Sequence, residues 1–239
     1  MGQNLKFKDI LKKKKTYDLY SEVVAYIATP FVSLFISIGL TPNMVSMIGI
    51  GCVFLSGLSF AFNLNILAVF LLYLGLVMDF TDGMVARCTN KVSKYQSVYL
   101  ERIYHEFAYA FIFIGIGYNL ELIGLFLGVI CTISILSTSY LFHLKNWILS
   151  SFAKQDMKED NFNAVGMNSN VSFLFELGAI PTKYIKFILL ISVIINILLR
   201  TYNIFPAILI LYTIYLLLRV PAYFILNYKT LGEFEKCKQ

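Results

Sequence analysis

Long apolar segments alternate along the chain with shorter polar connections. An α-helix needs about 20 apolar residues to cross the hydrocarbon core of a bilayer, which is roughly 30 Å thick. Six segments reach or approach this length, and flanking polar residues can extend the shorter ones to the membrane surface. They lie at residues 44–62, 66–87, 98–118, 122–142, 187–199 and 204–218. The pattern predicts an all-α polytopic membrane protein with six transmembrane helices.

Residues 23–40 are also apolar enough to cross a bilayer, but the basic residues around them argue against a crossing. Lys and Arg gather in the cytosolic loops of membrane proteins. If this segment lies in the interface, the basic residues at 12–15, 87–102 and 145–186 and those of the tail all fall on the cytosolic side. Only Arg200 remains outside. We therefore expect an interfacial amphipathic helix ahead of the six spans.

Two prolines, Pro30 and Pro42, support this interpretation because proline disfavours a straight crossing helix. We expect an integral protein of the cytoplasmic (inner) membrane with both termini in the cytosol. The expected regions are a basic N-terminus with the interfacial helix at 1–40, a six-helix transmembrane domain at 41–228 with a cytosolic loop at about 145–181, and a cytosolic tail at 229–239.

The composition agrees with a membrane protein, since 58% of the 239 residues are hydrophobic and only 14% are charged. A soluble domain of this size could not bury so much apolar surface. The net charge of +6 is concentrated in loops and tails, which indicates membrane topology and attraction to anionic lipids, and no nucleic-acid partner. The four cysteines are scattered and show neither metal-ligand spacing nor a disulfide framework.

Carboxylates stand out near the end of the second apolar segment. Asp79 and Asp82 are three residues apart and therefore share one helix face. Each carboxylate at membrane depth costs roughly 2.5–3.5 kcal/mol, so a partner such as a divalent cation is expected. Glu101 and His105, four residues apart near the start of the third segment, can face them from an antiparallel neighbouring helix. Carboxylate oxygens suit Mg²⁺ or Mn²⁺.

Small and basic residues follow the two aspartates. Gly83 and Ala86 leave room beside the acids for a bulky ligand, and Arg87 can present its guanidinium fork to a phosphate. A divalent cation and a phosphate fork together indicate phosphate chemistry at the membrane surface.

Residues 79–87 resemble the D-x-x-D-G-x-x-A-R opening of the CDP-alcohol phosphatidyltransferase signature. Residues 41–46, T-P-N-M-V-S, are similar to the T-P-N-x-x-[ST] segment that enters the first span in that family. The six-span layout with an interfacial N-terminal helix also resembles the family.

The second half of the signature, x8-G-x-x-x-D-x-x-x-D, departs from the family pattern. Strict spacing from Arg87 puts Leu100 at the first of the two later acids, and leucine cannot bind a metal. One extra residue in the loop gives Ser97, Glu101 and His105 at the glycine and the two acids. We prefer this register because a surface loop accepts an insertion at little cost.

The resemblance implies a two-metal site of Mg²⁺ or Mn²⁺ and an enzyme that transfers a substituted phosphate group. An acceptor hydroxyl would attack the phosphorus next to the alcohol of a CDP-alcohol, such as CDP-diacylglycerol or a CDP-polyol, and CMP would leave. His105 would be the catalytic base. The implied metal ligands are Asp79, Asp82 and Glu101, and the implied nucleotide-binding residues are Asp82, Gly83, Ala86, Arg87 and Ser97.

Two basic residues near helix ends could contact the acceptor. Lys145 and Arg219 are candidates for binding the acceptor, although a cation near a helix end ordinarily extends to the membrane surface. The resemblance also implies a homodimer. The products would belong to phospholipid or related glycolipid biosynthesis, and the sequence does not identify the acceptor alcohol.

Alternatives stay open at this point. A transferase with a small CDP-polyol donor would keep the chemistry, and a degenerate family member would act only as a subunit. A cation-coupled carrier is a third possibility, against which stand the absence of inverted repeats and the position of the acids at the membrane edge. The two aspartates could also form a structural ion pair with Arg87 or Arg102.

Overall fold

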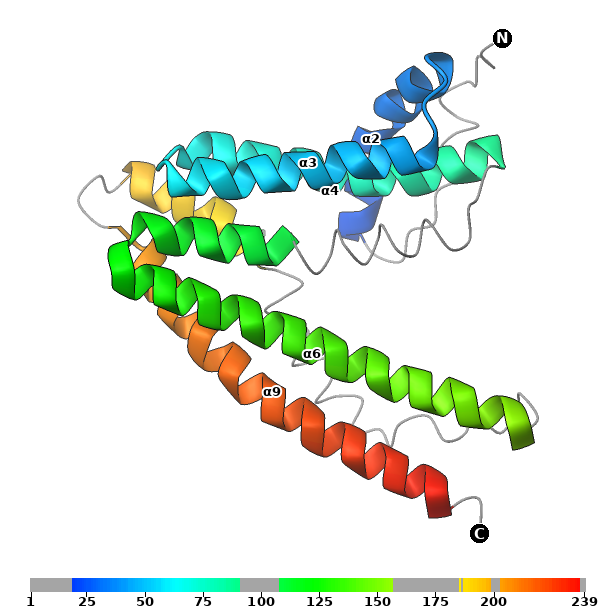
Figure 1. The fold of residues 1–239 in the computed structure, drawn as a ribbon. Coiled ribbons are helices and arrows are strands. Elements are labelled where there is room, and N and C mark those ends of the chain that lie inside the picture. Colours follow the sequence, from blue (N-terminus) through cyan, green and yellow to red (C-terminus); the bar gives the residue numbers. More distant parts are fainter. Residues whose placement is uncertain (1–18, 91–107, 157–184, 186, 199–202, 237–239) are drawn as a thin grey trace. The chain divides into compact units, whose positions relative to one another are not determined.

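The computed structural model describes residues 19–90, 108–156, 185, 187–198 and 203–236, and all regular secondary structure within them is helical. The chain divides into two compact units, Met1–Asn119 and Leu120–Gln239. The described helices (Figure 1) are α2 (Leu19–Ser37), α3 (Pro42–Ala61), α4 (Asn65–Thr89), Ala108–Asn119, α6 (Glu121–Asp156), Phe187–Leu198 and α9 (Phe205–Lys236).

Four helices of the described part are long and apolar enough to cross a membrane, and they coincide with the first, second, fourth and sixth predicted spans. Shorter apolar helices, Ala108–Asn119 and Phe187–Leu198, lie where the third and fifth spans were predicted. The prediction of an all-helical membrane-type fold is thus confirmed for the described residues. That six helices span the membrane and that α2 lies in the interface stay predictions.

Helix α2 continues through Pro30, so this proline does not end the helix. Pro30 is exposed, and the opposite face of α2, with Ala25, Ala28 and Val32, is buried. These small and β-branched side chains form a common hydrophobic cluster with α4 residues from Leu76 to Cys88. Figure 1 shows α2 crossing α3 and α4 at a steep angle. Tertiary packing holds the helix together where the proline removes one backbone hydrogen bond.

Helices α3 and α4 form an antiparallel hairpin. Thr41 caps α3, because its side chain accepts a hydrogen bond from the Met44 backbone N–H at 3.4 Å, and Pro42 occupies the first turn. At the other end Asn63 adopts a left-handed conformation (φ 59°) between the two helices. The Ser56 hydroxyl donates to the Ala68 carbonyl of α4 at 2.7 Å. This hairpin sets the first turn of α3 beside the last turns of α4.

A pair of glycines brings α3 and the helix Ala108–Asn119 into backbone contact. A Cβ atom added to Gly115 would lie 2.1 Å from the Gly57 carbonyl oxygen, and one added to Gly57 would lie 2.6 Å from the Phe111 carbonyl oxygen. Small residues at crossing points are typical of helices that associate in membranes, where close packing replaces the hydrophobic effect.

In the second unit α6 and α9 pack side by side and run in the same direction (Figure 1). The Cys131 Sγ and Thr213 Oγ1 atoms are 3.1 Å apart, and the Asn227 Nδ2 donates to the Leu141 carbonyl at 3.0 Å. Both helices extend past their predicted ends at 142 and 218, so α6 runs on into the segment from 145 that we expected to be a loop. A helix can continue into polar sequence because its backbone hydrogen bonds do not depend on apolar side chains.

Candidate active site

The two aspartates of the motif lie in the C-terminal half of α4, and both are partly buried. The opposite side of this helix is anchored, because Thr81, Met84 and Val85 are almost completely buried, the last two in the cluster shared with α2. This packing fixes the rotation of α4 about its axis. The face carrying Asp79 and Asp82 is therefore held away from α2.

Ser46 of α3 holds the second aspartate, since its hydroxyl donates a short hydrogen bond to Asp82 Oδ2. This contact follows from the hairpin: the cap at Thr41 starts α3 beside the end of α4, and Ser46 follows in the second turn. The sequence analysis included Ser46 in the T-P-N-M-V-S segment but gave it no role. The structure brings this segment and the aspartate motif into contact through this hydrogen bond.

Arg87 folds back over Gly83 on the same helix. A Cβ atom added to Gly83 would lie 3.3 Å from an Nη atom of Arg87, so the guanidinium lies directly over the glycine. Arg87 also interacts electrostatically with Asp82, and its side chain is exposed. The arrangement sets one positive group beside the Asp82 carboxylate and leaves it accessible, as a phosphate-binding group must be.

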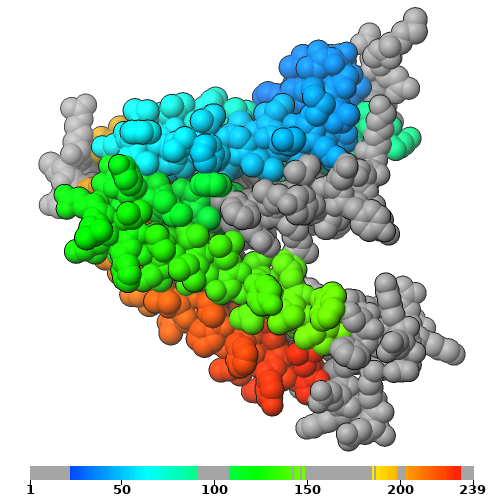
Figure 2. Space-filling view, in the orientation of Figure 1, coloured from blue at the N-terminus to red at the C-terminus, as the bar shows by residue number. Residues whose placement is uncertain are grey.

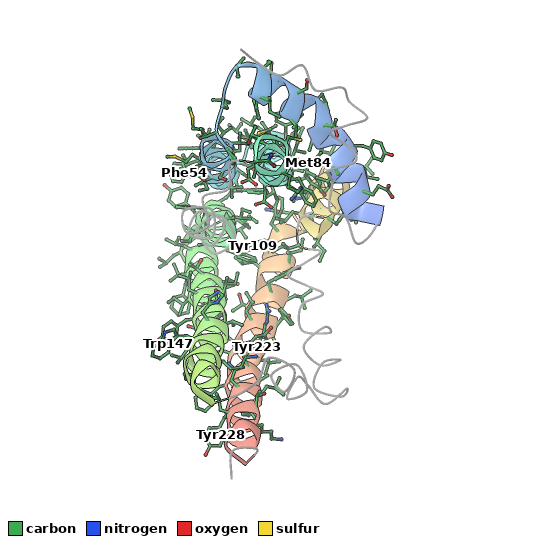
Figure 3. The ribbon with its side chains drawn as sticks, turned by 90° about the vertical axis from the view of Figure 1, so that its right-hand side faces the viewer. Phe54, Met84, Tyr109, Trp147, Tyr223 and Tyr228 are labelled. Atoms are coloured by element: carbon green, nitrogen blue, oxygen red, sulfur yellow. The ribbon has the colours of Figure 1, made fainter. Side chains whose placement is uncertain are left out.

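Tyr109 is a neighbour that the sequence analysis missed. Its hydroxyl interacts electrostatically with the Asp79 carboxylate. Figure 3 looks nearly along the axis of α4 at Met84 and labels Tyr109, which lies at the start of the helix Ala108–Asn119. A signal was available, because Tyr109 follows His105 by four residues and would share its helix face. Its position brings the start of the helix Ala108–Asn119 close to the motif.

Three predicted site residues, Ser97, Glu101 and His105, lie outside the described residues. Within the residues that the structure describes, no group of three or more His, Cys, Asp or Glu side chains is placed to hold a metal ion. Asp79 and Asp82 carry carboxylate oxygens, the ligand type that a divalent cation prefers, on one face of α4. The convergence of all four groups stays a prediction.

The two candidate acceptor-binding residues belong to the second unit. Arg219 donates from Nη2 to the Tyr223 hydroxyl at 3.0 Å, and its guanidinium lies 4.9 Å from the centre of the Tyr223 ring. It is partly buried against α9 itself, and Lys145 on α6 is partly buried too. Figure 3 shows Tyr223 on α9 and Trp147, which follows Lys145 by two residues, on α6.

Comparison with known proteins gives two findings. Residues 39–217 match the family profile of the CDP-alcohol phosphatidyltransferases. An archaetidylinositol phosphate synthase of Pyrococcus horikoshii is 41% identical over 59 residues, which are 25% of this chain and 31% of that protein. The chain thus matches less than a third of the length of this relative.

Proposed function

The chain belongs to the CDP-alcohol phosphatidyltransferase family, and from this membership we propose that it transfers a substituted phosphate group from a CDP-alcohol to an acceptor hydroxyl. The bond between the phosphorus and the CMP oxygen breaks, the acceptor oxygen bonds to the phosphorus, and CMP leaves. The single observation that carries the proposal is the site in the C-terminal half of α4. This part of the helix holds Asp79, Asp82 and Arg87, and the Ser46 hydroxyl donates a hydrogen bond to Asp82. Its apolar helices make the protein an integral membrane protein.

Asp79 and Asp82 would hold Mg²⁺ or Mn²⁺ together with Glu101. A divalent ion there would neutralise charge on the diphosphate of the donor. The residues around the acids bind the nucleotide: Arg87 offers a bidentate donor to a phosphate, Gly83 keeps the adjacent surface free of a side chain, and Ala86 adds little bulk. Ser97 would complete the nucleotide pocket from the following segment.

His105 is proposed as the base that removes the proton from the acceptor hydroxyl. Its unperturbed pKa near 6.5 suits this role. We expect His105→Ala to lower turnover by roughly 10²- to 10⁴-fold, the usual contribution of general-base catalysis, with nucleotide and metal binding unchanged. CMP release and Mn²⁺ binding measured on the same preparation check this. Full activity of both His105→Ala and His105→Asp would contradict the assignment.

Ser46→Ala is expected to weaken metal binding by roughly 10- to 100-fold, the usual loss when a group that orients a metal ligand is removed. The Mn²⁺ affinity of the purified protein, read from the electron paramagnetic resonance of free Mn²⁺, measures this without turnover. Ser46→Thr keeps the hydroxyl and should restore binding. An unchanged affinity in Ser46→Ala would show that the bond to Asp82 has no part in holding the ion.

The acceptor is best sought by measuring CMP release from CDP-diacylglycerol with a panel of alcohols. The name of the Pyrococcus horikoshii relative makes inositol phosphate the first acceptor to test, followed by glycerol phosphate, serine and other polyols. Release of CMP that requires both a divalent ion and one of these acceptors supports the proposal. A protein that binds Mn²⁺ and CDP-alcohol but releases no CMP with any acceptor would be a degenerate member of the family.

The proposal also includes the membrane topology, the acceptor-binding residues and the oligomeric state. Helix α2 would lie in the cytosolic interface, six helices would span the inner membrane, and both termini and the site would face the cytosol, in line with the basic residues. Lys145 and Arg219 would contribute to binding an acceptor phosphate. A homodimer is proposed from the family alone.

A further inference from the structure

Two tyrosines flank Arg219 on α9, one helical turn before it and one turn after it. The Arg219 guanidinium lies 6.0 Å from the centre of the Tyr215 ring and 4.9 Å from that of Tyr223. Its Nη2 also donates a hydrogen bond to the Tyr223 hydroxyl at 3.0 Å. Side chains on a helix lean toward its N-terminus, so the Tyr223 ring leans back over the turn that carries Arg219. Tyr223 thus contacts the guanidinium twice, through its ring and through its hydroxyl.

Tyr223 lies where α9 packs against α6. It is only 8% exposed, and Asn227, one turn further on, is 6% exposed. The Asn227 amide donates to the Leu141 carbonyl of α6, which anchors this face of α9 on its neighbour. Figure 2 shows the surfaces of α6, in green, and α9, in orange and red, adjoining along the two helices. The ring that meets Arg219 is therefore buried beside an anchored contact between two helices.

Arg219 lies at the edge of this contact and not within it. Four residues advance an α-helix by one turn plus about 40°, so Tyr223 and then Arg219 rotate step by step away from the contact that Asn227 makes. The burial follows this rotation, since Asn227 and Tyr223 are buried and Arg219 is only partly buried. An arginine near a helix end ordinarily extends to the membrane surface. Here two aromatic rings and a hydrogen bond hold it at the edge of the α6–α9 pair.

A fixed guanidinium binds a phosphate more tightly than a mobile one, because its side chain has lost conformational entropy before the ligand arrives. Stacking on a ring also gives the planar fork a defined direction, which bidentate binding of two phosphate oxygens requires. We propose that Tyr223 is a positioning residue, which holds the Arg219 guanidinium in the direction that a phosphate on the acceptor requires. This inference rests on the proposed role of Arg219 in binding the acceptor. Tyr223 acts through Arg219 and needs no contact with the substrate.

Isothermal titration of the full-length protein in detergent with Mg²⁺ tests this inference without turnover. The probes are inositol phosphate and glycerol phosphate, and the one that binds more tightly is used for the variants. Tyr223→Phe keeps the ring and removes only the hydroxyl. We expect it to weaken binding of the probe about tenfold, the lower end of what a hydrogen bond to a charged group contributes. CMP, whose phosphate is proposed to bind at Arg87, should bind equally well to this variant and to the unmodified protein.

Tyr228→Phe is the matched control, because Tyr228 is 74% exposed on the same helix and the substitution also removes one hydroxyl. It should bind the probe like the unmodified protein. A double variant separates positioning from a general effect on the fold. Once Arg219→Gln has removed the guanidinium, adding Tyr223→Phe should weaken binding no further, because Tyr223 then has no guanidinium to hold.

Equal affinities of Tyr223→Phe and Tyr228→Phe for the probe would overturn the proposal, and so would an unmodified protein that binds neither probe. A further loss when Tyr223→Phe is added to Arg219→Gln would also overturn it, as would a similar loss of CMP binding in Tyr223→Phe. Each measurement is of binding and not of CMP release. A protein that binds the probe but transfers no phosphate group would therefore contradict the proposed function and leave the role of Tyr223 to be decided by its own result.

Discussion

Asp82→Asn is expected to reduce CMP release from a CDP-alcohol by more than roughly a hundredfold, because it removes a proposed metal ligand. Loss of a group that only orients a ligand already costs 10- to 100-fold. The substitution keeps the size of the side chain and lets the Ser46 hydroxyl still donate to the remaining oxygen. Steady-state CMP release over a range of Mg²⁺ concentrations measures the effect, and excess Mg²⁺ should not restore the rate.

The matched control is Glu121→Gln, which neutralises an exposed carboxylate at the start of α6 and is expected to leave CMP release unchanged. Thermal unfolding in detergent should be similar for both variants, which separates a chemical effect from loss of the fold. A normal rate for Asp82→Asn would remove the basis for a metal site on α4.

Gly115→Ala is expected to destabilise the first unit by about 3 kcal/mol, near the upper end of the usual range for overpacking. The added methyl group would lie 2.1 Å from the Gly57 carbonyl oxygen, a backbone atom that moves only if α3 and the helix Ala108–Asn119 separate. For a chain of this size the shift corresponds to roughly 6–12 °C in the midpoint of thermal unfolding. A fluorescence-based unfolding assay in detergent measures it.

Gly51→Ala provides the control on the same helix, because a Cβ atom at Gly51 would have no neighbouring atom within 4 Å. This variant should be neutral or slightly more stable, since alanine favours a helix by about 1 kcal/mol over glycine. If the two variants unfold at the same temperature, the close contact between Gly57 and Gly115 does not exist in the protein.

The helices were predictable because each depends on local features of the chain. Hydropathy located α3 and α4, and Thr41 with Pro42 marked the start of α3. The ends of α6 and α9 were not predictable in this way, because a helix that continues into polar sequence leaves no mark in the hydropathy. The continuity of α2 through Pro30 was not predictable either, because the buried residues on the opposite face of α2 outweigh the local effect of the proline.

The site was predictable only in part. The spacing of Asp79 and Asp82 placed them on one helix face, which the structure confirms through the burial of the opposite face. The partners of these acids come from other helices. Ser46 precedes Asp82 by 36 residues, and no local pattern links the two. Tyr109, which interacts electrostatically with Asp79, likewise belongs to a different helix.

The sequence by itself determined the membrane class, the positions of the main apolar helices and the family motif, because hydropathy and residue spacing act over one or two helical turns. The tertiary structure alone decided which helices touch: α2 against α4, Ser46 against Asp82, and Gly57 against Gly115. Such contacts depend on how the helices rotate and cross, which many distant side chains set together.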